Sequence, residues 1–471
     1  MHGLFGLPVF VSHNMEETAD KEMVFHFIKG MLGLTCAVGE VLFCQAIRTR
    51  YGTRTGYLTF LFLSINSGMF HSATSLLPSS SCMIAVLYGY AAWLHEQHIA
   101  GLFVGAYAVL FCWPFVALMF IPMGIDSLYN KGIVPVTTSA MISMVVFTAI
   151  PSLLESYLYG ERIFPILNLV MYNSFGHGGN GQGADLYGTE PWYFYIQNLV
   201  LNLNLIFVMA VFAPLFLVFI YNKPTQGTSG FQTFLYLSAG IFTTVFFSCM
   251  AHKEERFLSM VYPIICFGAA LNLDQIISFT TRLFDKQTPT IIVKLLSVLI
   301  VVLIVFISMS RNAALVYSFA APQQVYHELS IIPNDEPVQV CVGKEWYRFP
   351  SSFFLPKNVE IVWVKSGFDG QLPQKFSKWP GTHIRHTHFN DINKEEPKSY
   401  AHPASCEYAI DLAVGDDNGD IGQWEGRWSK VVCRPFLDAG SSPAFIRSFF
   451  IPFNVSTSHN VYAEYCLLKK I

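Results

Sequence analysis

Five consecutive ionisable residues, His252 to Arg256 (HKEER, the HKEER loop), lie between two long apolar segments. The segment before them, 231–249, has no charged residue, and Asp274 is the one charge in the segment after them, 258–277. A charged side chain beside a bilayer is costly and is usually retained for a ligand, an ion or a partner. With three bases and two acids, the loop can hold an anionic group and still balance its own charge. A solvated connection between two membrane helices is the alternative, but so much charge in so short a loop favours a binding site.

A second motif, DLYGTEPWYFY at 185–195, follows a glycine-rich stretch at 176–183 and leads into another apolar segment. Its acids can accept hydrogen bonds from sugar hydroxyls, and its aromatic rings can stack on sugar faces. Tyr and Trp also gather at membrane interfaces for purely physical reasons, so an aromatic belt is the alternative. Paired acids in a frame of Gly and Pro favour a sugar- or acceptor-binding site with these candidate residues: Asp185, Tyr187, Glu190, Trp192 and Tyr193.

The composition is that of a membrane protein. Of 471 residues, 52% are hydrophobic and only 13% are charged, whereas soluble domains contain nearer a quarter charged residues. Apolar windows long enough to cross about 30 Å of hydrocarbon recur along the chain, which predicts a polytopic α-helical membrane protein. No basic run suggests nucleic acid, and no Cys or His spacing suggests a metal. The acidic run at 416–420 is interpreted as a solvated turn and not as a metal site.

The apolar windows predict membrane spans, and the segment 99–131 is too long for one span. About 33 residues of helix would reach about 50 Å, and proline interrupts helices, so we expect this segment to break at Trp113-Pro114. After Pro322 the composition becomes polar, with short alternating runs, which predicts an α/β domain. The spans are expected near 24–47, 56–76, 82–97, 99–131 in two parts, 132–154, 196–221, 231–251, 258–278 and 292–310; the strands at 338–342, 360–364, 408–413 and 461–467; and a helix at 443–450. The predicted domains are an N-terminal arm (1–23), a multispanning region (24–321) with a lumenal loop at 155–195, and a C-terminal α/β domain (322–471).

Two signals predict the orientation in the membrane. Arg48, Arg50 and Arg54 cluster in one short loop, which the positive-inside rule places in the cytoplasm. Asn454 begins the glycosylation sequon Asn-Val-Ser, which has meaning only in a lumenal or extracellular domain. If the segment 99–131 forms two spans, the chain crosses the membrane an odd number of times between the arginine cluster and Asn454. An odd number places the two on opposite sides, so the two signals agree. The HKEER loop and the 155–195 loop then face the lumen together with the C-terminal domain.

Other residues carry weaker signals. Glu40 lies inside the first apolar segment, where an acid is either functional or hydrogen-bonded to a neighbouring helix. His71 and His95 are interpreted as packing residues. The N-terminus has neither the basic nor the apolar region of a signal peptide.

Four cysteines lie in the polar C-terminal region and can pair if it faces an oxidising compartment: Cys341, Cys406, Cys433 and Cys466.

Three long motifs carry a family resemblance. DLYGTEPWYFY (185–195), HKEERFL (252–258) and VCVGKEWYRFPSSFFLP (340–356) resemble the lumenal α-1,2-mannosyltransferases of N-glycan precursor assembly, which are GT-C glycosyltransferases of family twenty-two. GMFHSATSLLPSS (68–80), WPF (113–115) and RPFLDA (434–439) extend the likeness, which runs from about Val24 to the end. The resemblance implies an endoplasmic reticulum enzyme that transfers mannose from dolichyl-phosphate-mannose to dolichyl-diphosphate-linked oligomannose, with inversion and without a metal or other cofactor.

The resemblance also suggests roles for the HKEER loop. A donor with its phosphate at the membrane interface needs cations at a lumenal helix end, where His252, Lys253 and Arg256 lie. A helix opening at Leu258 would add its N-terminal dipole. Arg256 is the better phosphate ligand because its guanidinium can bind two oxygens, and Glu254 or Glu255 is expected to orient it.

The chain departs from this family near its start. Relatives carry another membrane helix and an acidic lumenal loop, taken to supply the catalytic base, before the segment that matches Val24. The residues 1–22 do not resemble that loop, so Glu16, Glu17 and Asp20 are not assigned as the base. We expect the sequence to be N-terminally incomplete or divergent, with weak activity alone. A glycosylphosphatidylinositol mannosyltransferase, a transporter and a non-catalytic relative are the alternatives; inverted repeats typical of transporters are absent.

Overall fold

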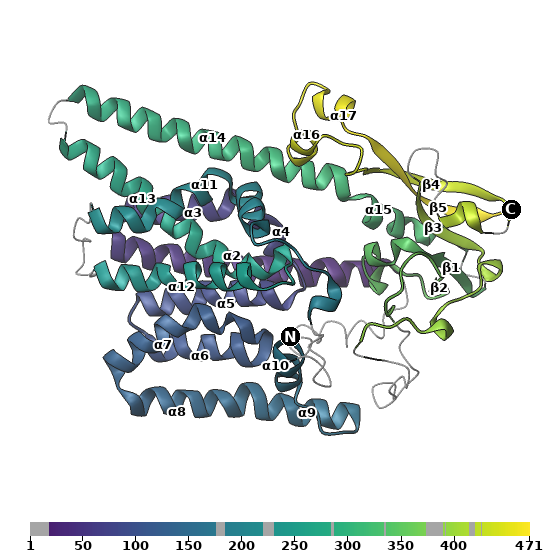
Figure 1. The fold of residues 1–471 in the computed structure, drawn as a ribbon, viewed down its shortest axis with the longest axis horizontal. Coiled ribbons are helices and arrows are strands. Elements are labelled where there is room, and N and C mark those ends of the chain that lie inside the picture. The colour runs from purple at the N-terminus through teal and green to yellow at the C-terminus, as the bar shows by residue number, and fades with distance from the viewer. Residues whose placement is uncertain are drawn as a thin grey trace. The chain divides into compact units, whose positions relative to one another are not determined.

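The computed structural model describes residues 18–175, 184–219, 230–283, 287–333, 336–373, 390, 392–413, 420–424 and 426–471. The chain forms two compact units. Residues Lys29–Met309 form one, the helical unit, and Met1–Ile28 with Ser310–Ile471 form the other, the C-terminal unit. Figure 1 labels their helices and strands.

Six helical stretches are long and apolar enough to cross a membrane, within the described residues. They confirm the predicted polytopic α-helical fold. They involve α2 (Thr18–Tyr51), α8 (Ile133–Met144) continuing into α9 (Ile150–Tyr159), α11 (Phe194–Phe219), α12 (Gly230–Cys249), α13 (Tyr262–Leu283) and α14 (Gln287–Phe319). The shorter helices are α3 (Thr53–Ile65), α4 (Ser67–Ser72), α5 (Pro78–Leu94), α6 (His98–Tyr107), α7 (Ala117–Lys131) and α10 (Pro165–Phe175).

Two predicted spans are interrupted for different local reasons. The segment 99–131 breaks at Trp113, whose backbone is extended (φ −154°, ψ 114°) just before Pro114, so the predicted split is confirmed. Proline lacks the N–H that a continuous helix would use. The predicted span 56–76 is broken at Asn66, which ends α3. Its side chain then accepts a hydrogen bond from the Met69 N–H and caps α4, as asparagine commonly does.

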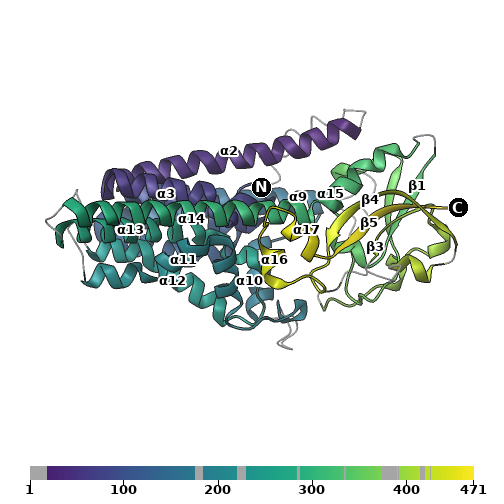
Figure 2. The same ribbon diagram turned by 90° about the horizontal axis from the view of Figure 1, so that it is seen from above.

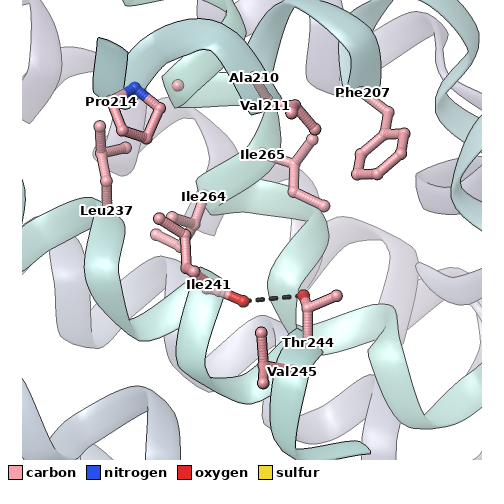
Figure 3. Close-up of a pocket in the computed structure, with 12 residues that line it drawn as sticks. Phe207, Ala210, Val211, Pro214, Leu237, Ile241, Thr244, Val245, Ile264 and Ile265 are labelled. Atoms are coloured by element: carbon pink, nitrogen blue, oxygen red, sulfur yellow. Dashed lines mark hydrogen bonds between the residues drawn. The ribbon is translucent and has the colours of Figure 1, made fainter. Parts of the chain in front are cut away.

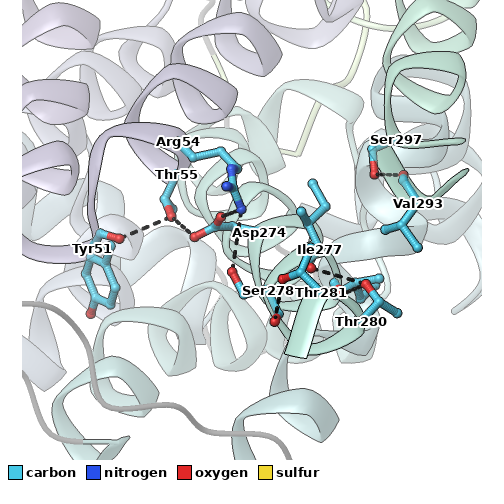
Figure 4. A network of polar contacts seen from close by, with 11 residues as sticks. Tyr51, Arg54, Thr55, Asp274, Ile277, Ser278, Thr280, Thr281, Val293 and Ser297 are labelled. Atoms are coloured by element: carbon cyan, nitrogen blue, oxygen red, sulfur yellow. Dashed lines mark hydrogen bonds and ion pairs between the residues drawn. The ribbon is translucent and has the colours of Figure 1, made fainter. Parts of the chain in front are cut away.

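A polar network at one end of the helical unit ties α3 to α13 (Figure 4). Arg54 Nη1 donates to Asp274 Oδ1 at 2.9 Å, and Thr55 Oγ1 donates to Asp274 Oδ2 at 2.9 Å. Asp274 lies in the second half of α13, whereas the HKEER loop precedes the start of that helix. Arg54 lies in α3, whereas Arg48 and Arg50 lie in the last turn of α2, and the contact of Arg54 is in the half of α13 away from the HKEER loop.

The C-terminal unit contains a five-stranded sheet in the order β2-β1-β3-β5-β4. The strands are β1 (Val338–Val342), β2 (Val359–Trp363), β3 (Tyr408–Ala413), β4 (Trp428–Leu437) and β5 (Tyr462–Lys470). β1 pairs with β2 and β3 in parallel, while β5 pairs with β3 and β4 antiparallel. Figure 2 shows β3, β5 and β4 from above. The short helix α15 (Ala321–His327) packs on this sheet, and α16 (Ala444–Ser448) lies inside the predicted helix 443–450.

Sequence analysis missed β4, one of the two edge strands of the sheet, because its sequence lacks the pattern expected of a strand. Its burial does not alternate along its length, and it contains Pro435, which is tolerated at sheet edges. Two disulfides hold the unit together, Cys341–Cys406 and Cys433–Cys466. All four cysteines of the polar region are therefore paired, and the other six are free. Cys433, Glu464 and Cys466 form the one group of possible metal ligands among the described residues, but the disulfide consumes both sulfurs.

Candidate active site

The structure brings the two charged and aromatic motifs together within the helical unit. His252 Nδ1 lies 2.8 Å from the Gly188 carbonyl oxygen. The Glu190 N–H donates to the Ala251 carbonyl at 3.0 Å, and Lys253 Nζ donates to the Glu190 carbonyl at 2.7 Å. Main-chain and side-chain hydrogen bonds thus hold the segment before α11 against the HKEER loop.

Gly188 allows the chain to turn at this contact. Its φ is 96°, a region that residues with a Cβ rarely adopt. The turn aims the Gly188 carbonyl at His252, and Pro191 follows just before α11 begins at Phe194. The frame of Gly and Pro seen in the sequence therefore has a specific structural role.

Lys253 is buried in the loop, with 6% of its surface exposed. Its ammonium donates to the carbonyls of Glu190 and Met250. Among the described residues, no carboxylate lies within ion-pair distance of this ammonium. Sequence analysis placed Lys253 on the donor phosphate, whereas the geometry favours a positioning role, in which the ammonium clamps the two segments and contributes positive potential.

Arg256 is held on one edge by Glu254. Arg256 Nε lies 2.6 Å from Glu254 Oε2, and Nη2 donates to Oε1 at 2.8 Å. This is the orienting role expected of Glu254 or Glu255. The guanidinium has five N–H donors, so its Nη1 side remains available, and the side chain is 46% exposed. The arginine is thus fixed in direction with one donor edge open.

The charge state of Glu254 follows from its neighbours. Burial is the largest single influence and raises the pKa of the carboxyl, but the hydrogen bonds and charges of Arg256 and His252 together lower it more. The net pKa lies below its ordinary value. Glu254 is therefore a carboxylate at neutral pH, as the orientation of Arg256 requires.

Glu255 begins the next helix and faces other elements. Helical structure starts there as a 3-10 segment, Glu255–Val261 (η5), before α13, so it begins earlier than the expected start at Leu258. Glu255 Oε1 accepts a hydrogen bond from Asn202 Nδ2 at 2.5 Å and lies 3.5 Å from His71 Nε2. Glu255 therefore links α13 to α11 and α4. His71, interpreted as a packing residue, contributes a polar contact.

Three aromatic rings support the loop. Trp113, at the break in the segment 99–131, stacks on Phe247 with ring centroids 5.5 Å apart and 18° between planes. It also lies 5.1 Å from the ring of Phe257, above which Arg256 Cζ is 5.8 Å from the centroid. Sequence analysis identified the break and the motif WPF but did not connect either with the site. The extended backbone at Trp113 brings its ring to this stack.

The predicted sugar-binding residues lie on the segment before α11, and the structure describes all of their side chains except that of Asp185. Tyr187 is exposed, and its ring lies 6.3 Å from that of His252. Trp192 and Tyr193 are also exposed, in an edge-on pair 5.9 Å apart. Glu190 has an exposed side chain beside them. Asp185 belongs to a short 3-10 turn (η4, Ala184–Tyr187), but its side chain lies outside the described residues.

The remaining candidates lie elsewhere. Glu40 accepts a long hydrogen bond from Cys36 Sγ at 3.6 Å on the same helix. His95 is exposed at the end of α5. Glu16, Glu17, the Asp20 side chain and the acidic run at 416–420, apart from the Asp420 backbone, lie outside the described residues.

An apolar cavity of about 390 Å³ opens between α11, α12 and α13 (Figure 3). Its lining includes Val245 near the end of α12 and Ile264 near the start of α13, the helix ends that flank the HKEER loop. Thr244 is a polar lining residue, but its hydroxyl donates a hydrogen bond to the Gly240 carbonyl at 2.8 Å. The cavity therefore offers hydrocarbon contacts close to a charged loop.

Comparison with known proteins places these features in a family. The model of the Alg9-like mannosyltransferase family matches residues 4–356, so the match begins earlier than the likeness traced from Val24. The chain is 35% identical to alpha-1,2-mannosyltransferase ALG9 of Mus musculus over 96% of this chain and 76% of that protein. It is 24% identical to GPI mannosyltransferase 3 of Candida albicans over 50% of this chain and 46% of that protein. The fold is also similar to that in the crystal structure of ArnT from Cupriavidus metallidurans bound to undecaprenyl phosphate, with a TM-score of 0.44. That similarity covers 73% of this chain and 72% of the ArnT chain, at 13% sequence identity.

The family match covers most of the chain, including both motifs of the site and the start of the C-terminal sheet. Identity to the mouse enzyme extends over nearly all of the sequence. This chain is therefore a glycosyltransferase that belongs to the Alg9-like mannosyltransferase family.

Proposed function

We propose that this protein transfers mannose from dolichyl-phosphate-mannose to a dolichyl-diphosphate-linked oligomannose, forming an α-1,2 linkage with inversion on the lumenal side of the endoplasmic reticulum membrane. The single observation that carries the proposal is Arg256, oriented on one edge by Glu254 and open on the other, in a loop that His252 and Lys253 tie to the segment 186–193. Family membership supports the mannosyl chemistry. The similarity to GPI mannosyltransferase 3 covers 50% of the chain and that to the mouse α-1,2-mannosyltransferase covers 96%, which favours the oligomannose acceptor over the alternative.

The open edge of Arg256 suits a lipid phosphate that leaves during transfer. The acceptor hydroxyl attacks C1 of mannose, the bond from C1 to the phosphate oxygen breaks with its electron pair, and the hydroxyl proton passes to a base. The departing phosphate gains negative charge as the bond breaks. An arginine already held in place stabilises that charge without reorganising, so its effect is larger in the transition state than in the ground state.

The apolar cavity and the exposed aromatic rings suit the other parts of the two substrates. The cavity, lined by residues such as Ile241 and Ile265, can take isoprenoid units of a lipid whose phosphate lies at the loop. Trp192 and Tyr193 are exposed beside the loop, where rings can stack on sugar faces. Tyr187 lies on the same segment, next to His252.

The function is tested by mannose transfer in membranes that lack the endogenous α-1,2-mannosyltransferase. We expect this chain to lengthen the lipid-linked oligomannose when dolichyl-phosphate-mannose is supplied, and not to add mannose to a glycosylphosphatidylinositol precursor. Chromatography of the released glycans measures the addition. Transfer to the glycosylphosphatidylinositol precursor alone would establish the alternative, and absence of both products with the protein correctly inserted would contradict the proposal.

The lumenal orientation of the C-terminal unit is the second testable part. Both disulfides support it, because disulfides persist in oxidising compartments. Asn454 is exposed and adopts φ 64° at the start of a short helix, α17 (Val455–His459). We expect a glycan on Asn454 in a eukaryotic host, seen as a gel shift after glycosidase treatment. Ser456→Ala removes the sequon and should abolish the shift. Digestion of the unit by protease added to sealed microsomes would contradict the proposed orientation.

A further inference from the structure

A polar cavity of about 740 Å³ lies within the C-terminal unit, and no part of the proposed transfer site uses it. Its lining comes from the first turns of α2, from α15 and the residues on either side of it, and from single residues of a 3-10 turn (η8, Ser352–Phe354) and of β4. We call it the α15 pocket. It is lined by Glu22, Met23, His26, Ala320, Gln323, Gln324, His327, Glu328, Phe354 and Arg434. Ligand pockets commonly have volumes of roughly 300–1,000 Å³.

The amphipathic pattern of α15 creates one wall. Ala321, Val325 and Tyr326 are buried in the core beneath the helix. Gln323, Gln324 and His327 lie on the opposite side, exposed, and line the pocket. The helix is thus anchored by its apolar face and presents polar side chains at i, i+1 and i+4, which fall within an arc of about 100° around the helix axis.

The charges of the pocket are paired internally. His327 Nδ1 lies 2.6 Å from Glu22 Oε2, and Arg434 Nη2 lies 3.0 Å from Glu328 Oε1. Arg434 Nη1 also donates to the Cys433 carbonyl at 3.3 Å, so the one guanidinium of the lining is already engaged, and its other bases are the histidines His26 and His327. The lining therefore offers no open guanidinium edge like that of Arg256 for a phosphate, and no free pair of carboxylates for a metal ion. Such a balance suits a neutral ligand that both donates and accepts hydrogen bonds.

Two side-chain amides are available for such a ligand. Gln323 and Gln324 are exposed, and their amides form no hydrogen bond with other described residues. An amide offers both donors and an acceptor, as adjacent sugar hydroxyls do. Met23 is the one exposed large apolar side chain among the described lining residues, since Phe354 is 2% exposed. An apolar peptide or a lipid would find little surface here.

We propose that the α15 pocket binds a neutral oligosaccharide, and that its ligand is a mannose branch of the acceptor glycan. The identity of the glycan rests on the proposed function; the preference for a neutral, hydroxyl-rich ligand does not. The stretches SFFLP and RPFLDA, distant in sequence, meet here through Phe354 and Arg434. The pocket is thus a second glycan-binding site, separate from the residues that handle the donor phosphate.

The test uses the full-length protein in detergent and a water-soluble oligomannose without any lipid. Binding is followed by saturation-transfer NMR and by titration of the glycan. We expect the double variant Gln323→Ala/Gln324→Ala to bind oligomannose about tenfold more weakly, from the loss of hydrogen bonds worth about 1 kcal/mol in total or slightly more. In transfer assays, the same variant should raise the KM for the glycan acceptor and leave kcat near the wild-type value.

Two controls separate this inference from the proposed function. Gln97→Ala, in the helical unit, removes an exposed glutamine at the N-cap of α6 whose side chain forms no capping hydrogen bond, and it should leave binding unchanged. Arg256→Ala should lose transfer but keep glycan binding, since binding needs no donor. Equal affinity of wild type and the double variant, or no oligomannose binding by wild type, would overturn the α15 pocket. Neither result would affect the transfer assay, which by itself decides the proposed function.

Discussion

Replacing Arg256 with alanine is expected to lower the rate of mannose transfer about 10²- to 10³-fold, the usual effect of removing one preorganised donor from a developing anion. The guanidinium is fixed by two contacts to Glu254 at 2.6 and 2.8 Å, so its open edge is directed before substrate binds. Its removal also leaves Glu254 without its main partner, which adds negative charge beside the proposed phosphate. Transfer is measured from lipid-linked glycans, with protein amount checked by immunoblotting.

Matched variants show whether this effect belongs to the site. Arg256→Lys should recover only part of the activity, because an ammonium cannot contact Glu254 and two phosphate oxygens with a planar fork. Arg427→Ala removes an exposed arginine of the C-terminal unit and should have no effect on transfer. Full activity of Arg256→Ala at normal protein level would remove Arg256 from the donor site.

Lys253→Met should give the second large loss of mannose transfer, because it loosens the contact between two segments and does not remove a phosphate ligand. Methionine keeps an unbranched stem but deletes the ammonium, so the Glu190 and Met250 carbonyls lose their shared donor. Hydrogen bonds to a charged donor contribute about 1.5–3 kcal/mol, so without them the segment 184–193 should separate from the HKEER loop more often. We expect transfer to fall about ten- to a hundredfold, which is the rate equivalent of that free energy. Limited proteolysis should cut the segment faster than in wild type.

The proteolysis distinguishes a clamp from a direct ligand. Lys357→Met, at an exposed lysine of the C-terminal unit, serves as the control and should change neither activity nor cleavage. If Lys253→Met loses transfer while the segment remains as resistant as in wild type, the ammonium contacts substrate directly, as sequence analysis expected. Retained activity with unchanged cleavage would contradict both roles.

Much of the fold could be predicted because it depends on local physics. Long apolar runs require helices in a membrane, since no water is present to satisfy backbone groups. The break at Trp113 follows from the proline after it, and alternating apolar residues predicted β1, β2, β3 and β5. β4 was missed because its burial does not alternate, and its proline argued against a strand. The pairing of the four cysteines is set by which strands lie side by side, which spacing does not reveal.

The candidate site was likewise predictable only in part. The sequence by itself determined that charge is concentrated between two membrane helices and that an aromatic segment lies near another, because residue type and hydropathy are local properties. Tertiary structure decided which charges are available. It directs Lys253 to the Glu190 carbonyl and Glu255 to Asn202 and His71, which lie on elements far apart in the chain. With these groups engaged, Arg256, held by its near neighbour Glu254, keeps an open edge. A hydrogen bond depends on distances of a few tenths of an ångström between such elements, and only the packing of the helices sets those distances.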